Sequence, residues 1–219
     1  MSEAVAAPAM TGLITPLVLT RNEAANVSRT LAKLAWAGET LVVDSLSTDD
    51  TVALARQFPR TRVLQRAFDT HSLQWNYGLS EARTEWVLAL DADYVLSDEL
   101  VRELQDWQSE EGVVAYYASI RYCIGGHPLR GTLYPPRPVL FHRAYCHYEQ
   151  DGHTQELVIK GRTGQLQGTI LHDDRKPVSV FLRAQDRYAR LEAEKLLEAG
   201  RERLHMWRIP QTGMQGGGH

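Results

Sequence analysis

The segment Trp86-Val87-Leu88-Ala89-Leu90-Asp91-Ala92-Asp93 decides the fold, because an apolar run leads directly into two carboxylates. The shorter segment Leu41-Val42-Val43-Asp44 repeats this arrangement. Short continuous apolar runs are typical of buried parallel strands. Open α/β sheets bind ligands just outside the carboxyl ends of their strands. The sequence therefore predicts an acidic ligand site at one edge of a parallel sheet.

Strands and helices are expected to alternate through the first half of the chain. The expected strands are 13–19, 40–43, 62–65 and 86–90, and Pro16 suits the beginning of the first strand better than its middle. The expected helices open at Asn22-Glu23, after the cap-rich run 45–50, over 71–82 and after Ser97. This order predicts an α/β fold with a mostly parallel sheet, right-handed crossovers and helices on both faces.

The character of the sequence changes after Gly112. β-rich runs at 113–124, 138–142 and 157–160 are separated by turn residues, which predicts a mixed or antiparallel β extension. Pro177 then opens a long helix. We expect a flexible leader over 1–12, an α/β half over 13–110, a mixed β region of the same domain over 111–176, a C-terminal helix over 177–208 and a disordered tail over 209–219.

Composition limits the class of protein. A chain of 219 residues with 43% hydrophobic and 23% charged residues is ordinary for one globular domain. The net charge of −3 argues against bulk nucleic-acid binding, although 121–143 contains arginines and no acidic residue, which favours a local anion site. Two cysteines without metal spacing, no secretory signal and no long apolar run predict a cytoplasmic protein. Peripheral contact with the inner face of the membrane stays open.

Asp91 and Asp93 are the sharpest candidates for chemistry. Carboxylates one residue apart at a strand end can hold a divalent cation through oxygen ligands, but an acidic turn before the Ser97 helix would look the same. Asp44 can bind a ribose or base or serve as a turn residue. Neither a dinucleotide fingerprint nor a Walker loop occurs in the sequence. Any phosphate chemistry therefore needs a metal.

Three segments together resemble family 2 glycosyltransferases of the GT-A fold. They are 20–23 (Thr-Arg-Asn-Glu), 42–51 (Val-Val-Asp-Ser-Leu-Ser-Thr-Asp-Asp-Thr) and 90–93 (Leu-Asp-Ala-Asp). The nearest subgroup looks like the bacterial lipopolysaccharide-core glucosyltransferases, and the similarity covers roughly 13–190. The sequence departs from the family pattern at Tyr94, where an acidic or polar residue is usual.

The resemblance implies a UDP-sugar donor, and it assigns donor-side residues. Thr20, Arg21, Asn22, Glu23 and Asp44 would surround the uridine, while Asp91 and Asp93 would bracket the ribose and a Mg²⁺ or Mn²⁺ ion. The half 13–110 would bind the nucleotide sugar, and the region 111–176 would face the acceptor.

An inverting transfer also needs a base near the acceptor hydroxyl. The segment 148–156 is the only good candidate region. Asp151 is our first choice, Glu149 the second and Glu156 the third. His153 would touch the acceptor or brace the base. The alternative is a polar loop between strands.

Two further segments carry possible ligands. In 171–177, His172 could complete the metal shell with Asp93, and Arg175 and Lys176 could neutralise a diphosphate; a helix-capping cluster is the alternative. The segment 125–138, with Arg130 and Arg137, is interpreted as a lid over the donor or a contact for a phosphorylated acceptor. Its arginines could equally be solvated.

The sequence thus predicts a metal-dependent, inverting glycosyltransferase that moves a hexose from a nucleotide sugar to a cell-envelope glycan or glycolipid such as lipopolysaccharide core. A nucleotidyltransferase is one alternative, but it would need a Gly-rich basic loop where 20–23 stands. A catalytically weak sugar-nucleotide-binding homologue is the other.

Overall fold

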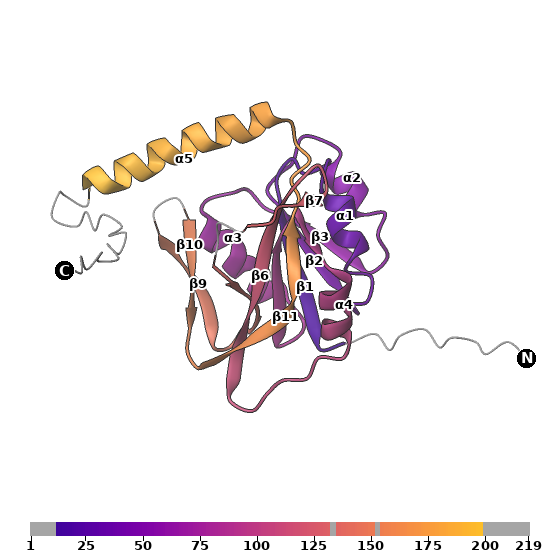
Figure 1. Cartoon of the computed structure of the whole chain (residues 1–219). Helices are drawn as coiled ribbons and strands as arrows, with labels where there is room; N and C mark the ends of the chain where they lie inside the picture. Colours follow the sequence, from indigo (N-terminus) through magenta and orange to yellow (C-terminus); the bar gives the residue numbers. More distant parts are fainter. Residues whose placement is uncertain (1–11, 132–134, 152–153, 199–219) are drawn as a thin grey trace, which may run out of the picture. The chain divides into compact units, whose positions relative to one another are not determined.

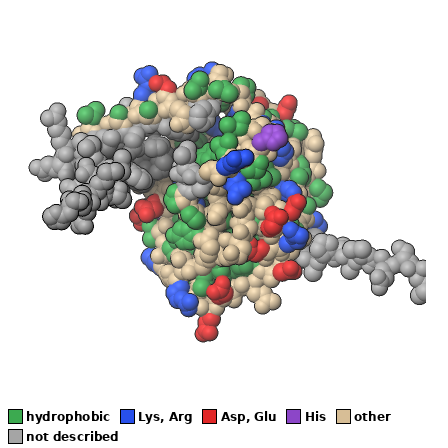
Figure 2. All heavy atoms as spheres, viewed as in Figure 1, with side chains coloured by type: hydrophobic (Ala, Val, Ile, Leu, Met, Phe, Trp, Pro, Cys, Tyr) green, Lys and Arg blue, Asp and Glu red, His purple; other side chains and the backbone are tan. Residues whose placement is uncertain are grey.

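The computed structural model describes residues 12–131, 135–151 and 154–198 (Figure 1). The chain divides after Val178 into two units. The first unit contains the sheet with its covering helices and is described first. Its surface in Figure 2 mixes charged and hydrophobic side chains, in keeping with the small net charge of −3.

The predicted alternation of strands and helices is confirmed. The four strands β1 (Ile14–Thr20), β2 (Thr40–Asp44), β3 (Thr61–Gln65) and β4 (Trp86–Asp91) are parallel, in the order β3-β2-β1-β4. The helices are α1 (Val27–Ala32), α2 (Thr51–Ala55), α3 (His71–Glu81) and α4 (Asp98–Gln105). The prediction that the first helix opens at Asn22-Glu23 is wrong. Asn22 has a φ of 56°, which a right-handed helix excludes.

The second half extends the same sheet as a mixed region, as predicted. β8 (Arg137–His142) is antiparallel to β4 and to β6 (Val113–Ile124), and β11 (Arg162–His172) is parallel to β6. The short β5 (Tyr94–Leu96) closes the order β3-β2-β1-β4-β8-β6-β11-β5, and β7 (His127–Pro128) pairs with β6. β9 (Cys146–Asp151) and β10 (Thr154–Ile159) form a separate hairpin.

Pro16 lies inside β1 rather than at its beginning. Pairing of β1 with β2 starts only at Leu17, opposite Leu41. The N–H that proline lacks therefore costs no ladder hydrogen bond on that side. On the other side of β1, Pro16 is in register with Leu88 of β4.

Side chains of the parallel strands alternate between two hydrophobic cores, because successive strand residues point to opposite faces. One core joins the sheet to α1, α2 and α4, and the other joins it to α3 and β9. The first includes Val18, Val42, Leu88, Leu90, Leu31, Ala55, Leu100 and Leu104. The second includes Leu17, Leu41, Val43, Val87, Ala89, Trp75, Leu79, Cys146 and Tyr148. The expected helices on both faces are present (Figure 1).

Gly168 marks the closest approach between β11 and α4. A Cβ at this position would lie 2.4 Å from the backbone Cα of Leu100. The Gly168 N–H also donates to Glu103 Oε2 at 2.9 Å. Backbone cannot yield as a flexible side chain does, so this contact excludes any larger residue.

We expect Gly168→Ala to lower the free energy of unfolding by about 1–3 kcal/mol or more, because overpacking forces the helix and strand apart. Urea unfolding followed by circular dichroism measures this as a lower midpoint. Gly131→Ala is the matched control, since nothing lies within 4 Å of a Cβ at that position. Equal midpoints for the two variants would contradict the close approach.

Helix α5 (Val178–Glu198) belongs to the second unit and is described by itself. It exposes Val178, Leu182 and Leu197, and Arg190 pairs with Asp186 one turn earlier at 3.0 Å. The predicted C-terminal helix is thus present over part of 177–208, and the rest of that range and the predicted tail lie outside the described residues. Across 12–131, 135–151 and 154–198, no helix is long and apolar enough to cross a membrane.

Candidate active site

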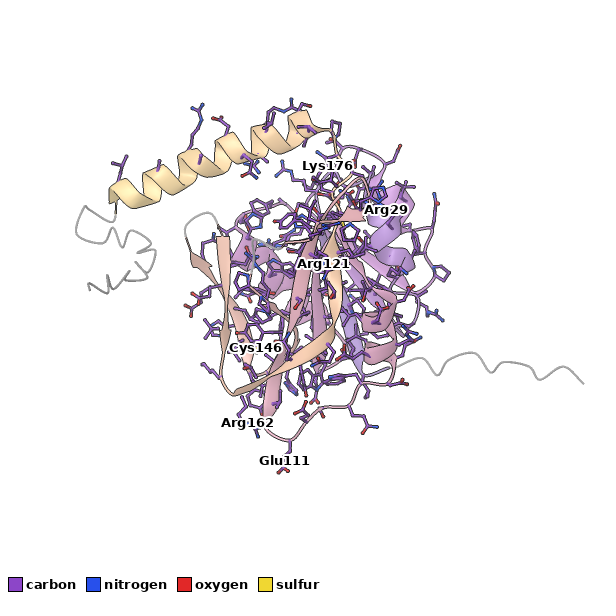
Figure 3. The ribbon with its side chains drawn as sticks, viewed as in Figure 1. Arg29, Glu111, Arg121, Cys146, Arg162 and Lys176 are labelled. Carbon is purple, nitrogen blue, oxygen red and sulfur yellow. The ribbon has the colours of Figure 1, made fainter. Side chains whose placement is uncertain are left out.

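The carboxyl ends of the parallel strands meet at one edge of the sheet. Thr20 is paired with Asp44, and Leu19 with Asp91, where β1, β2 and β4 end. His172 is paired with Tyr122 where β11 runs beside β6. Figure 3 shows Arg29 and Lys176 near this edge, with Glu111 and Arg162 at the opposite end. The structure therefore brings together groups that lie far apart in the sequence.

Asp93 and His172 form the centre of this edge. Asp93 Oδ2 lies 3.2 Å from His172 Nε2, and the Asp93 carbonyl accepts a hydrogen bond from the Asp173 N–H at 3.0 Å. The His172 ring lies between two tyrosine rings, with centroid distances of 5.2 Å to Tyr94 and 4.4 Å to Tyr122. The imidazole is thus held with one nitrogen toward the carboxylate.

Asp91 adds a second carboxylate to the pair. Its side chain is open to solvent but closely surrounded by protein. The pKa of Asp91 is raised to about 6, first because the protein around its carboxyl group excludes water and then because of the charge of Asp93, while His172, Arg137 and a hydrogen bond from Tyr94 oppose the rise. Burial lowers the pKa of His172, but Asp93 and Asp91 raise it overall. A divalent cation bound here would offset the electrostatic repulsion between the two neighbouring carboxylates.

The residues at this edge fit a metal that binds together with a nucleotide. Among the residues that the structure describes, no group of three or more His, Cys, Asp or Glu side chains is arranged to hold a metal ion. Mg²⁺ at nucleotide sites is usually held by one or two carboxylates, with phosphates and waters completing its shell. Asp93 is such a carboxylate, and the predicted ligand His172 adds an imidazole nitrogen beside it. Their side chains already converge at 3.2 Å.

Asp44 lies deeper than its predicted role suggests. It is fully buried and accepts hydrogen bonds from Thr20 Oγ1 at 2.8 Å, from the Ser47 N–H at 2.8 Å and from Gln65 Nε2 at 3.3 Å. Its oxygens are therefore engaged by the protein. Asp44 therefore fixes the loop after β2, which lies at the carboxyl edge of the sheet.

The segment 20–23 is bound to that same loop. Asn22 donates its N–H to Ser47 Oγ and accepts from the Thr48 N–H, each at 2.8 Å. The Glu23 N–H donates to Thr51 Oγ1 at 2.7 Å. Arg21 is exposed. These contacts order the predicted donor segment before any ligand arrives.

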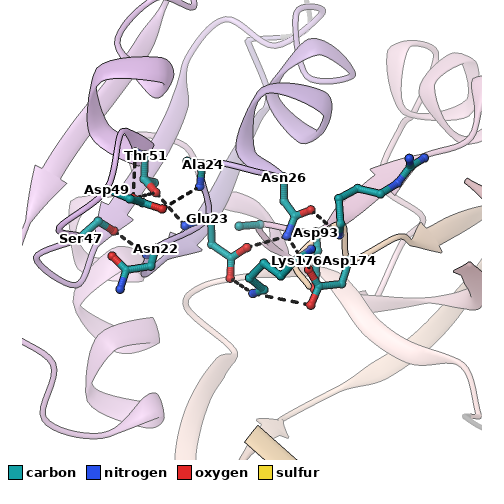
Figure 4. A network of polar contacts seen from close by, with 12 residues as sticks. Asn22, Glu23, Ala24, Asn26, Ser47, Asp49, Thr51, Asp93, Asp174 and Lys176 are labelled. Carbon is teal, nitrogen blue, oxygen red and sulfur yellow. Dashed lines mark hydrogen bonds and ion pairs between the residues drawn. The ribbon is translucent and has the colours of Figure 1, made fainter. Parts of the chain in front are cut away.

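A strap formed by residues 173–176 crosses to the loop after β1 (Figure 4). Lys176 Nζ contacts Glu23 Oε1 at 2.5 Å, and Asn26 Nδ2 donates to Glu23 Oε2 and to Asp174 Oδ1, each at 2.8 Å. Burial raises the pKa of Glu23 although Lys176 opposes the rise. The strap ties the end of β11, and so His172, to the predicted donor segment.

Arg175 is placed differently from its predicted role. Its Nε donates to Asp173 Oδ2 at 2.8 Å, whereas the neighbouring His172 pairs with Asp93. Lys176 Nζ instead contacts Glu23 Oε1 at 2.5 Å and Asp174 Oδ2 at 3.7 Å. The two basic residues of the strap are therefore held by different carboxylates.

The Glycosyl transferase family 2 model matches residues 17–172, which include all of these strand ends. The chain belongs to glycosyltransferase family 2. This confirms the family that the segments 20–23, 42–51 and 90–93 indicated.

Relatives in the family differ in how much of their length is matched. An uncharacterized glycosyltransferase from Rickettsia felis is 37% identical over 93 residues, or 42% of this chain and 32% of that protein. The chain thus spans about a third of the Rickettsia relative. LpsC from Rhizobium meliloti, a lipopolysaccharide core biosynthesis glycosyltransferase, is 24% identical over 198 residues, which is 86% of this chain and 73% of LpsC.

Solved structures support the fold. Residues 1–349 of S. aureus TarS, in complex with UDP-GlcNAc, superpose with a TM-score of 0.58 and 16% identity, covering 75% of this chain and 59% of that one. The UDP complex of the same TarS fragment gives a TM-score of 0.56. The predicted GT-A type of sheet is therefore confirmed.

The predicted base residues of this family 2 site lie on the β9–β10 hairpin rather than on a loop. Asn76 of α3 anchors the hairpin, because its side chain bonds both the carbonyl and the N–H of Tyr148, at 2.8 and 2.9 Å. Glu149 is exposed and its Oε1 lies 3.1 Å from His147 Nε2. Asp151 ends β9 opposite Thr154. His153 lies outside the described residues.

Arg137 belongs to the strand edge. The β4–β8 register pairs Trp86 with His142 and Leu88 with Leu140, and because the two strands are antiparallel, β8 begins with Arg137 toward the end at which β4 finishes. In agreement, the Arg137 charge is among those that lower the pKa of Asp91, against the larger effect of burial. Arg130 is exposed in the preceding turn segment. Sequence periodicity alone does not give the antiparallel direction of β8, which brings Arg137 toward this edge.

Proposed function

We propose that the protein is an inverting glycosyltransferase that moves a hexose from a UDP-sugar to a cell-envelope glycan or glycolipid. The observation that carries this proposal is the convergence of Asp93 and His172 beside Asp91 at the carboxyl edge of a family 2 sheet. The UDP-GlcNAc complex of the similar TarS fold supports a UDP-sugar donor. In this proposal, 13–110 binds the donor and 111–176 faces the acceptor.

Cleavage of the anomeric C–O bond leaves negative charge on a departing diphosphate. A bound Mg²⁺ or Mn²⁺ would stabilise this charge as a Lewis acid. Asp93 and His172 would hold the ion, and Lys176 and Arg137 would contribute positive charge from two sides of the carboxylates. The segment 20–23, with the buried Asp44 behind it, would shape the uridine pocket.

The acceptor hydroxyl must lose its proton as the new bond forms. We propose Asp151 for this role and Glu149 as the second candidate. Asp91 follows Val87 and Ala89 on the sheet face that α3 and the hairpin cover. This placement of the hairpin on the same face supports a base delivered from β9.

The acceptor that we propose is of the lipopolysaccharide-core type, on the cytoplasmic side of the membrane. The similarity to LpsC over 86% of the chain supports it. Peripheral membrane contact is part of this proposal, through the exposed apolar residues and arginines of α5. Arg183, Arg187 and Arg190 are the exposed arginines of that helix.

A thermal-shift assay tests the donor. With UDP-glucose and Mn²⁺ at roughly 100 times the Kd, we expect about 2.7 kcal/mol of stabilisation, or roughly 5–10 °C in Tm for a domain of this size. Neither UDP-glucose with EDTA nor Mn²⁺ alone should produce it, and a parallel GDP-mannose sample tests nucleotide preference. An equal shift without metal would contradict the metal part of the proposal. No shift with any nucleotide sugar would contradict donor binding.

A further inference from the structure

A cavity of about 350 Å³ is lined by the strap residues Asp173 and Arg175 and by residues of α1, β5, β6 and β11 and the segments next to them. His172 and Asp173 are consecutive, but His172 pairs with Asp93, whereas Asp173 lines this cavity. The cavity is therefore separate from the strand edge proposed for the nucleotide. Its lining consists of Arg29, Ala32, Lys33, Val95, Cys123, Gly126, Leu171, Asp173 and Arg175.

The surface of the cavity is mainly apolar, and three basic residues are among those that line it. Ala32, Val95, Cys123 and Leu171 provide the non-polar lining, and Arg29, Lys33 and Arg175 provide the positive charge. This volume falls at the small end of the range for small-molecule sites, which typically pair an apolar lining with a few placed polar groups.

Asp173 is the only acidic side chain in the lining, and its oxygens are already occupied. Oδ2 accepts from Arg29 Nη1 at 2.6 Å and from Arg175 Nε at 2.8 Å, and Oδ1 accepts from the Gly126 N–H at 3.0 Å. Asp173 is only 6% exposed. It therefore holds the two guanidinium groups in place and leaves the cavity lining with a net positive charge.

Both guanidinium groups keep donors for a further anion. A guanidinium has five N–H donors. Arg29 uses Nη1 and Nη2, toward Asp173 and Asn26, and Arg175 uses Nε and Nη2 toward Asp173. Lys33 pairs with Asp98 at the surface, where side chains are 37% and 77% exposed. Such an exposed pair is worth little and would yield to a ligand.

We propose that this cavity binds a phosphomonoester with a short apolar group. The phosphate would bridge Arg29 and Arg175, since guanidinium forks match phosphate oxygens. The hydrocarbon would lie against the apolar lining beside Val95 and Leu171. The volume suits one short chain rather than a long lipid tail. This site goes beyond the proposed transfer reaction and does not depend on it.

Isothermal titration of the full chain with hexyl phosphate tests the proposal. We expect saturable binding of one molecule, at least about tenfold tighter than inorganic phosphate or hexanol. Inorganic phosphate lacks the apolar group, and hexanol lacks the phosphate that would contact the guanidinium groups. Binding should persist at saturating UDP and Mn²⁺. Competition with UDP, or equal binding of inorganic phosphate, would overturn the proposal while leaving the transferase proposal untouched.

Two variants locate the binding. Ala32→Trp fills the cavity from an exposed position and should weaken hexyl phosphate at least about tenfold. Arg175→Gln should weaken binding to the same extent, because it removes the guanidinium that would donate hydrogen bonds to the phosphate. Ala35→Trp, exposed outside the cavity lining, is the matched control and should bind normally. Unchanged affinity in a folded Ala32→Trp protein, verified by its thermal unfolding, would place the ligand elsewhere and overturn the proposal.

Discussion

Replacing Asp93 with asparagine is expected to lower the rate of glycosyl transfer at least about 100-fold. The amide keeps the shape of the side chain but loses the negative charge that would hold the metal against His172. Losing about 3 kcal/mol of transition-state stabilisation corresponds to this change in rate, and a metal acting as a Lewis acid contributes several kcal/mol. Release of UDP from a UDP-sugar with a lipopolysaccharide-core acceptor measures the rate.

Asp106→Asn is the matched control, because Asp106 is an exposed carboxylate just after α4. It should transfer at the original rate. Both variants should unfold at temperatures close to that of the original protein. Full activity in Asp93→Asn would remove Asp93 as a metal ligand. A folding defect in that variant alone would instead assign it a structural role.

Asp151→Asn is expected to lose transfer by about 100-fold or more and to keep its affinity for the donor. A general base contributes roughly 10²–10⁴ to the rate, and Asp151 stands on the β9–β10 hairpin, for which we propose an acceptor-side role, rather than on β1, β2 or β4. Single-turnover transfer and the UDP-sugar thermal shift, measured on the same sample, separate chemistry from binding.

Glu149→Gln is the comparison that decides between the two carboxylates. Glu149 pairs with His147 at the surface, and its side chain is 65% exposed. Its variant should therefore retain most activity. The opposite pattern would make Glu149 the base. Normal transfer in both variants would show that the hairpin does not supply it.

Much of the fold could be predicted because buried strands leave a clear sequence signal. β2 and β4 are continuous apolar runs, and Ser97 caps α4 as expected, accepting from the Leu100 N–H at 3.2 Å. β5 was missed because three residues give no periodicity. β9 was missed because its buried residues Cys146 and Tyr148 alternate with polar ones inside a segment that resembles a loop.

The residues of the site that lie at strand ends could be predicted from the sequence. The partners of individual side chains could not. Asp91, Asp93 and His172 meet at one edge, as the parallel sheet requires. The order of two neighbouring basic residues could not be predicted, since Arg175 turns to Asp173 and Lys176 to Glu23. The burial of Asp44 depends on Thr20 and Gln65, which are brought to it by β1 and β3.

The strand order also constrains how the nascent chain matures during translation. β5 pairs with β11, and the loop after β1 is completed by Lys176. Thr20, Asp44 and Asp93 thus leave the ribosome long before the residues that finish their surroundings. Such long-range pairing slows folding and leaves early segments exposed. The edge therefore cannot be completed until nearly the whole first unit has been synthesised.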